Sequence, residues 1–364
     1  MKISIGILAW NEASSIRSTI HSVFSQSLIS NLRETGHRVE IICVPNGCTD
    51  NTALAAQGAM LAAAEKLNYQ ENLRWRVHEL KQPGKTNAWN VFIHELIDPQ
   101  ADVIFMVDAD IQIYMPDTLS NMLTKLMQNP QAFICTDLPV KHIVFKQHYS
   151  LLDQISMHTA RINQSASGQL CGQLYCARAA WLRRLWIPEG IIVEDGFIKK
   201  MAVSNFLTEP EDAARRLVIA ETASHVFEAY TRLPDVLATH RRQIAGYVIH
   251  RWIWEYLQEH QSEAPDAAAL IENLNRTAPG WSRRLIADKI KTRDYIRIYR
   301  ILIATRFIRF RGFSSPKKAA YAPLLAIHIL LDSIQFLSAL NMLCRGKLQK
   351  VWRDTRTTSG EINR

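Results

Sequence analysis

The first half of the chain alternates short runs of β-branched and apolar residues with segments of helical periodicity. Four runs predict β-strands: Ile3 to Leu8, Val39 to Val44, Trp75 to Leu80 and Val103 to Val107. Helical patterns follow them, beginning near Glu12, Thr49, Lys85 and Pro116. This alternation predicts an α/β, Rossmann-like domain with a mainly parallel sheet flanked by helices. The chain has 364 residues, 48% of them hydrophobic, so it can bury a large core.

Polar residues follow each of the four predicted strands. In open parallel sheets, ligands bind beyond the carboxyl ends of the strands. We therefore expect one crevice built from four segments: Trp10 to Glu12, Asn46 to Asp50, Pro83 to Asn87 and Asp108 to Asp110.

Two carboxylates, Asp108 and Asp110, directly follow the apolar run Val103 to Val107. Paired carboxylates at the end of a buried strand offer the hard oxygen ligands that Mg²⁺ or Mn²⁺ prefers, and such an ion can carry a diphosphate. The alternative is that both are solvated turn residues, because a D-x-D pattern is common in proteins.

A second acidic pair, Glu194 and Asp195, follows another apolar run. On a loop, one of these carboxylates could point into a cleft as a general base while neighbours anchor the other. The alternative is that both cap a helix that begins near Phe197, since acidic residues are favoured in first turns.

Lys85 lies in Pro83-Gly84-Lys85-Thr86, which lacks the glycine spacing of an ATP-binding phosphate loop. At a helix start, Lys85 could still meet a phosphate through its charge and the backbone donors around it. The alternative is a solvated lysine in a turn.

Five segments, in this order, resemble family 2 glycosyltransferases of the GT-A fold. The stretch Ile5 to Glu12 is similar to that family's first strand and P-x-Y-N-E turn, with Trp10 in place of tyrosine. Val44 to Thr52 is similar to its D-D-G-S-T-D-x-T segment, and Gly84 to Asn90 to its G-K-x-x-A-L-N helix start. Asp108 to Asp110 and Glu194-Asp195 are similar to its D-x-D and E-D motifs.

The resemblance implies roles for residues at the matching positions. Asp110, with Asp108, would hold Mg²⁺ or Mn²⁺ and the donor diphosphate, and Asp195, beside Glu194, would deprotonate the acceptor hydroxyl in an inverting transfer. The donor-binding segments contain Ala9, Trp10, Asn11, Glu12, Asn46, Lys85, Asn87 and Asp108. On the acceptor side, a loose similarity to the Q-x-x-R-W segment of processive synthases points to Arg241, Arg242 and Gln243.

The resemblance also implies a nucleotide-sugar donor, with a UDP-sugar as the first candidate. Pro45 and Asn46 stand where the family often has two aspartates, one of which recognises the base. The base is therefore less firmly indicated than the fold.

The second half of the chain predicts a helical extension, so we expect a catalytic domain at 1–230 and an extension at 231–364. Basic residues crowd between Arg293 and Lys318, and Tyr321 to Cys344 contains one charged residue, Asp332. A polar stripe recurs through this segment at His328, Asp332, Gln335, Ser338 and Asn341. The stripe favours lying on a membrane surface over spanning it, and packing on the protein stays an alternative.

These features together predict an enzyme at the cytoplasmic face of a membrane, acting on a glycan or lipid-linked acceptor. The apolar run at Met1 to Leu8 is too short for a secretory signal. Two other classes stay open: a non-catalytic membrane scaffold on the same fold, and a sugar nucleotidyltransferase, although no Gly-rich basic loop follows the first strand. The net charge of +9 alone would also suit a nucleic-acid partner, but no motif supports one.

Overall fold

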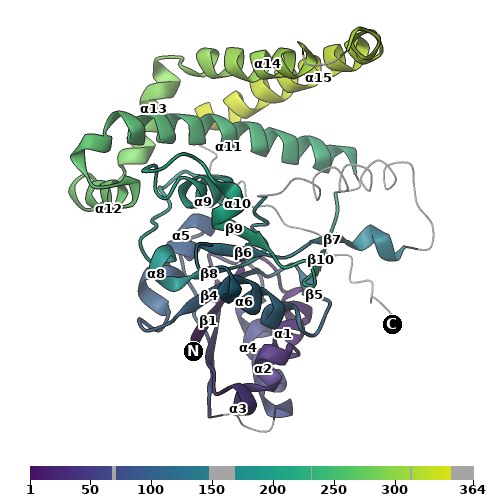
Figure 1. The fold of residues 1–364 in the computed structure, drawn as a ribbon, viewed down its shortest axis with the longest axis vertical. Coiled ribbons are helices and arrows are strands. Elements are labelled where there is room, and N and C mark those ends of the chain that lie inside the picture. Colours follow the sequence, from purple (N-terminus) through teal and green to yellow (C-terminus); the bar gives the residue numbers. More distant parts are fainter. Residues whose placement is uncertain (68–70, 147–168, 231, 312–313, 346–364) are drawn as a thin grey trace.

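The computed structural model describes residues 1–67, 71–146, 169–230, 232–311 and 314–345. A sheet with helices on both faces forms one end of the molecule, and a group of long helices forms the other (Figure 1). The predicted α/β class with a helical C-terminal part is confirmed.

Within the described residues the main sheet has seven strands. In spatial order they are β3 (Leu73–Val77), β2 (Arg38–Pro45), β1 (Lys2–Ala9), β4 (Val103–Asp108), β8 (Leu174–Arg178), β6 (Ile134–Thr136) and β9 (Leu217–Ile219). The first four are parallel and are the four strands that the sequence predicts. Strand β8 runs antiparallel between β4 and β6. Leu8 pairs with Val44 on one side and with Asp108 on the other, so three strands end side by side.

Alternating side chains of these strands enter two separate cores, as the pleat of a β-strand requires. Ile3, Ile5 and Ile7 pack on the face covered by α1 (Ile16–Phe24), α4 (Thr52–Lys66) and α6 (Thr118–Gln128). Ile42, Ile104 and Met106 face the opposite side, which α5 (Lys85–Val91) and α9 (Glu194–Val203) cover. Burial on both faces explains why β1, β2 and β4 read as continuous apolar runs, whereas β3, at the edge of the sheet, alternates exposed and half-buried residues.

Shorter elements complete this part of the molecule. A small sheet beside the main one contains β5 (Gln112–Ile113), β10 (His225–Phe227) and β7 (Val140–Lys141). The short helices are α2 (Ser27–Ser30), α3 (Leu32–Thr35), a π-helical turn (Phe92–Leu96), a 3₁₀ turn (His142–Phe145), α8 (Ala179–Leu182) and α10 (Ala213–Arg216).

The helical extension is built on one long helix, α11 (Leu233–Glu259), which lies across the end of the sheet domain (Figure 1). Next come a 3₁₀ turn (Gln261–Glu263), α12 (Ala267–Thr277), α13 (Trp281–Lys291), α14 (Tyr295–Arg311) and α15 (Ser315–Cys344). Helix α11 lies so close to the start of α9 that a Cβ on Gly246 would be 2.6 Å from Cγ2 of Val193. Phe197 of α9, Trp252 of α11 and Phe336 of α15 belong to one apolar core, so the extension and the sheet domain share their packing.

Candidate active site

A cleft of about 980 Å³ lies at the carboxyl ends of the strands and extends to α11 and α13. Residues from the ends of the parallel strands line this cleft or lie buried directly behind its lining. The predicted site residues that line the cleft are Trp10, Glu12, Lys85, Asn87, Asp108, Asp110, Glu194, Asp195, Arg242 and Gln243.

Two other predicted residues, Ala9 and Asn46, are completely buried behind the cleft wall. The Asn46 side chain donates a hydrogen bond to the Ala9 carbonyl at 2.7 Å and accepts one from the Gly84 N–H at 3.0 Å. Asn46 thus ties the ends of β1 and β2 to the start of α5.

Asn11 and Arg241 also take part in contacts outside the cleft lining. Asn11 has a positive φ of 55° and accepts a hydrogen bond from the Thr49 N–H at 2.7 Å. Arg241 points to α15, where it donates to the Ser338 hydroxyl at 3.4 Å. The structure therefore separates Arg241 from its neighbours Arg242 and Gln243, which face the cleft.

Lys85 joins the two acidic motifs. Its Nζ lies 2.7 Å from the Asp108 carboxylate and 2.7 Å from Oε1 of Glu194. The first residue of α5, the last of β4 and the first of α9 are thereby held together, although they are far apart in sequence. The prediction of a helix near Phe197 placed its start too late, because α9 already begins at Glu194.

The charges in this group depend on one another. Burial raises the pKa of Asp108 to about 7; Lys85 opposes this shift, while Asp110 adds to it. Burial also works against the charge on Lys85, but Asp108 and Glu194 outweigh it and raise the lysine pKa. Burial alone would raise the pKa of Glu194 as well, yet Lys85 and Arg242 lower it. Lys85 and Glu194 therefore form an ion pair, and Asp108 titrates near neutrality.

Asp195 lies in the first turn of α9, beside Glu194. A Cβ on Gly172 would be 2.8 Å from Cβ of Asp195, so the chain at Gly172 packs directly against this side chain. Burial raises the pKa of Asp195, and the Glu194 charge raises it further. A carboxylate with a raised pKa at the wall of a cleft has the properties of a general base.

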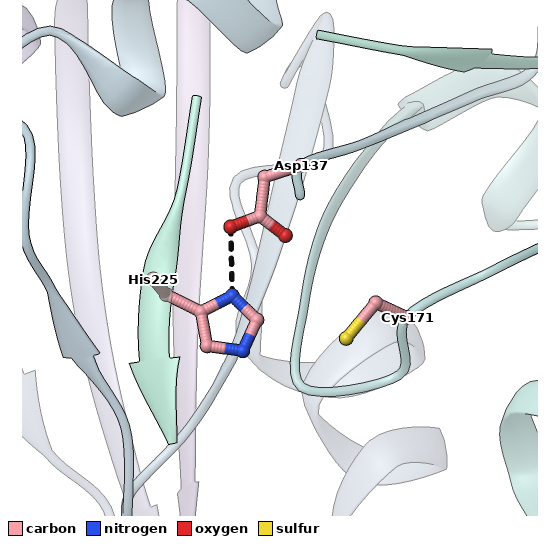
Figure 2. Close-up of side chains that lie close together, drawn as sticks. All are labelled: Asp137, Cys171 and His225. Atoms are coloured by element: carbon pink, nitrogen blue, oxygen red, sulfur yellow. Dashed lines mark hydrogen bonds and ion pairs between the residues drawn. The ribbon is translucent and has the colours of Figure 1, made fainter. Parts of the chain in front are cut away.

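A third polar group, which the sequence analysis did not find, consists of Asp137, Cys171 and His225. Their potential ligand atoms all lie within 4.8 Å of one another. Nδ1 of His225 is 2.7 Å from Oδ2 of Asp137, and the thiol lies on the side of the second ring nitrogen (Figure 2). Burial opposes protonation of His225, but Asp137 outweighs it and raises the histidine pKa to about 10. Asp137 directly follows β6, a strand end that could have indicated it, whereas nothing in the sequence connects the other two residues.

Two groups of side chains could hold a metal ion, the pair Asp108 and Asp110 and the group of Asp137, Cys171 and His225, and they offer different donor atoms. Asp108 and Asp110 provide carboxylate oxygens at the cleft, which fit Mg²⁺ or Mn²⁺. The Asp137 group offers oxygen, nitrogen and sulfur, a mixture that suits a softer ion such as Zn²⁺. The donor set at Asp108 and Asp110 thus fits the predicted Mg²⁺ or Mn²⁺ better.

Comparison with known proteins identifies the family of the first half of the chain. Residues 4–182 match the family model described as glycosyl transferase family 2. Residues 4–182 belong to glycosyl transferase family 2. The predicted family and GT-A fold class are therefore confirmed, and the chain is a glycosyltransferase. The family 2 domain contains the strand-end segments and the D-x-D motif, while Glu194-Asp195 and the helical extension lie beyond the matched range.

Two solved structures illustrate what the chain is similar to. Glucosyl-3-phosphoglycerate synthase from Mycobacterium tuberculosis, in complex with Mn²⁺, UDP and phosphoglyceric acid, is 18% identical, with 68% of this chain and 78% of that chain covered and a TM-score of 0.44. TarS 1–349 from S. aureus is 15% identical, with 95% and 92% covered and a TM-score of 0.43. No curated protein sequence matches the chain.

Proposed function

We propose that this glycosyltransferase is an inverting, metal-dependent enzyme that transfers a sugar from a nucleoside diphosphate sugar to an acceptor hydroxyl. The observation that carries the proposal is the Lys85 bridge. Nζ of Lys85 lies 2.7 Å from a carboxylate oxygen of Asp108, in the D-x-D motif, and 2.7 Å from one of Glu194, in the E-D motif. A donor-side acidic pair and a base candidate therefore share one cleft.

In this proposal, Asp108 and Asp110 hold Mg²⁺ or Mn²⁺ at the donor diphosphate. The ion, when bound, neutralises the charge that builds on the leaving diphosphate. Lys85, fixed at the first residue of α5, adds positive charge on the same side. Asp195 accepts the proton of the acceptor hydroxyl, and Glu194 stays ionised to keep Lys85 in place. The complex of the mycobacterial enzyme with UDP makes a UDP-sugar the first donor to test.

We further propose that the acceptor is lipid-linked or close to a membrane, at its cytoplasmic face. The apolar side chains that line the cleft include Ile286 and Ile290 of α13 and Leu343 of α15. Arg242 and Arg283, the second of which is paired with Glu189 at 2.5 Å, also line the cleft and could meet phosphate groups of such an acceptor. Apolar side chains and two guanidinium groups in one cleft suit a hydrocarbon chain that carries a phosphate.

The proposal is tested by incubating the purified protein with a panel of nucleotide-sugars in Mn²⁺, Mg²⁺ or chelator. Hydrolysis or transfer of one donor should require the metal and should disappear in Asp110→Ala and Asp195→Asn. Asp117→Asn serves as the matched control, because that carboxylate is exposed at the start of α6. If calorimetry shows no metal-dependent nucleotide binding and no donor is turned over, the scaffold alternative replaces the enzyme.

A further inference from the structure

Helix α15 exposes a row of large apolar residues to the solvent and turns Asp332 and Gln335 toward the protein. Asp332, which is 2% exposed, receives a hydrogen bond from Arg306 of α14 at 2.9 Å and lies 3.2 Å from His240 of α11. Ser333 bonds to Tyr299 of α14 at 2.7 Å. Of the polar stripe that the sequence revealed, Asp332, Gln335 and Ser338 face the protein and help to fasten α15 to α11 and α14. His328 and Asn341 are exposed.

The opposite side of the helix between Leu324 and Leu337, here called the outer face of α15, is formed by large apolar residues; the exposed His328 lies at its margin and the exposed Asn341 follows it. The outer face consists of Leu324, Ile327, Leu330, Leu331, Ile334 and Leu337, which are between 38% and 68% exposed. These residues recur every three or four positions, so they form one stripe, about 20 Å long at 1.5 Å per residue. A continuous stripe of large exposed aliphatic residues is unusual on a soluble protein surface and marks a contact site.

The position of this stripe fits a flat partner. Helices α14 and α15 lie at the end of the molecule farthest from the sheet domain, on the far side of α11 (Figure 1). The outer face is turned away from α11, since the buried residues Asp332, Phe336 and Ala339 occupy the inner side. No part of the described chain covers the outer face.

The charge of the neighbouring segment favours a lipid surface over a second copy of the chain as the partner of the outer face. Between Arg293 and Lys318 the sequence has eight basic residues and one acidic residue, Asp294. Lys317 and Lys318 lie in the first turns of α15, immediately before the apolar stripe. Anionic phospholipids attract such a segment, whereas two copies facing each other would repel.

We propose that the outer face of α15 lies in the plane of an anionic phospholipid membrane, buried in one leaflet. This inference rests on the proposed function, and it specifies which surface of the protein contacts the membrane. By length and composition Tyr321–Cys344 could cross a membrane. Crossing would require the contacts of Asp332 with Arg306 and His240 to break or to enter hydrocarbon, which is unfavourable. In-plane docking leaves all of them intact.

The test is co-flotation of the full chain with vesicles of phosphatidylcholine, alone or mixed with phosphatidylglycerol. We expect binding to the mixed vesicles. The double variant Ile327→Asp/Ile334→Asp should bind at least about a hundredfold more weakly, because each buried isoleucine contributes at least about tenfold. Leu54→Asp is the matched control: Leu54 is 74% exposed on α4, and its replacement should change nothing. Lys317→Glu/Lys318→Glu should weaken binding to the mixed vesicles by at least about tenfold.

The depth of α15 in the bilayer distinguishes in-plane docking from spanning, and the oligomeric state distinguishes membrane binding from self-association. A tryptophan at Ile327→Trp should be quenched by lipids brominated near the headgroup more strongly than by those brominated at the chain end; the reverse order would overturn in-plane docking. A wild-type dimer in light scattering that Ile327→Asp dissociates, without vesicle binding, would assign the face to self-association. These assays contain no metal or nucleotide, so their failure is distinguishable from failure of the proposed transferase reaction.

Discussion

Replacing Lys85 by methionine removes the cation that Asp108 and Glu194 share. Both carboxylates then lie near each other and near Asp110 without the charge that compensates them, in a region where Lys85 and Asp108 have side chains only 18% and 17% exposed. Removing one partner of a buried ion pair destabilises proteins by about 3–5 kcal/mol. We expect a loss of that size in the free energy of unfolding of Lys85→Met near pH 8.

The loss should depend on pH. Asp108 already has a folded pKa of about 7, above its ordinary value of 3.8, so its protonation favours the folded state and stability falls as pH rises through this window. Without Lys85 the pKa rises further and the window extends to higher pH. Acidification protonates the carboxylate and should therefore reduce the difference between Lys85→Met and wild type.

Urea denaturation near pH 5 and near pH 8 measures both effects. Lys81→Met is the matched control, because Lys81 is exposed four residues earlier and should cost less than about 0.5 kcal/mol. Lys85→Arg keeps the charge and should recover part of the stability. Equal unfolding free energies for Lys85→Met and wild type at pH 8, or a difference that grows on acidification, would refute the assigned electrostatics.

Three further outcomes follow from the site. Asp195→Asn should lower kcat by about 10²–10⁴ while UDP binding by calorimetry stays unchanged, since a general base acts after the donor is bound; an equal loss of binding would contradict this role. Asp110→Asn should abolish the Mn²⁺-dependent part of UDP binding, whereas Asp117→Asn should retain it. His225→Gln should destabilise the protein by a few kcal/mol at neutral pH. Because the folded pKa of His225 is raised to about 10 from 6.5, this contribution is complete below pH 6.5 and disappears as pH rises through 10, so unfolding curves at pH 7 and pH 10 check it.

Local patterns predicted those parts of the fold that local interactions determine. Three of the four parallel strands, β1, β2 and β4, are buried on both faces, so their apolar runs are legible in the sequence, and polar residues after Leu8, Val44 and Val107 indicated the cleft edge. The Lys85 bridge was not predictable, because it joins three segments whose proximity depends on the order of the strands. The same holds for His225, which meets Asp137 only through a small sheet of two- and three-residue strands.

Helical periodicity likewise revealed the polar stripe of α15 but could not say which way it faces. A stripe such as Asp332, Gln335 and Ser338 can meet water, lipid headgroups or other side chains. The structure resolves this through Arg306, which lies more than twenty residues earlier on α14. The direction in which a stripe faces depends on tertiary contacts, so only the spacing of the polar residues could be predicted, and their partners stayed open.

The packing of α11 against the start of α9 has a practical consequence for the design of shortened versions of this protein. The α/β part ends near residue 230, yet Val193 just before the acidic turn rests against Gly246, and Phe197 shares its apolar surroundings with Trp252. A chain cut after residue 230 would lose the helix that presses on this turn and would expose aromatic surface to water. We expect such a fragment to aggregate. The residues that match the family model are therefore related in sequence to other family 2 domains, but they do not form a unit that can be produced alone.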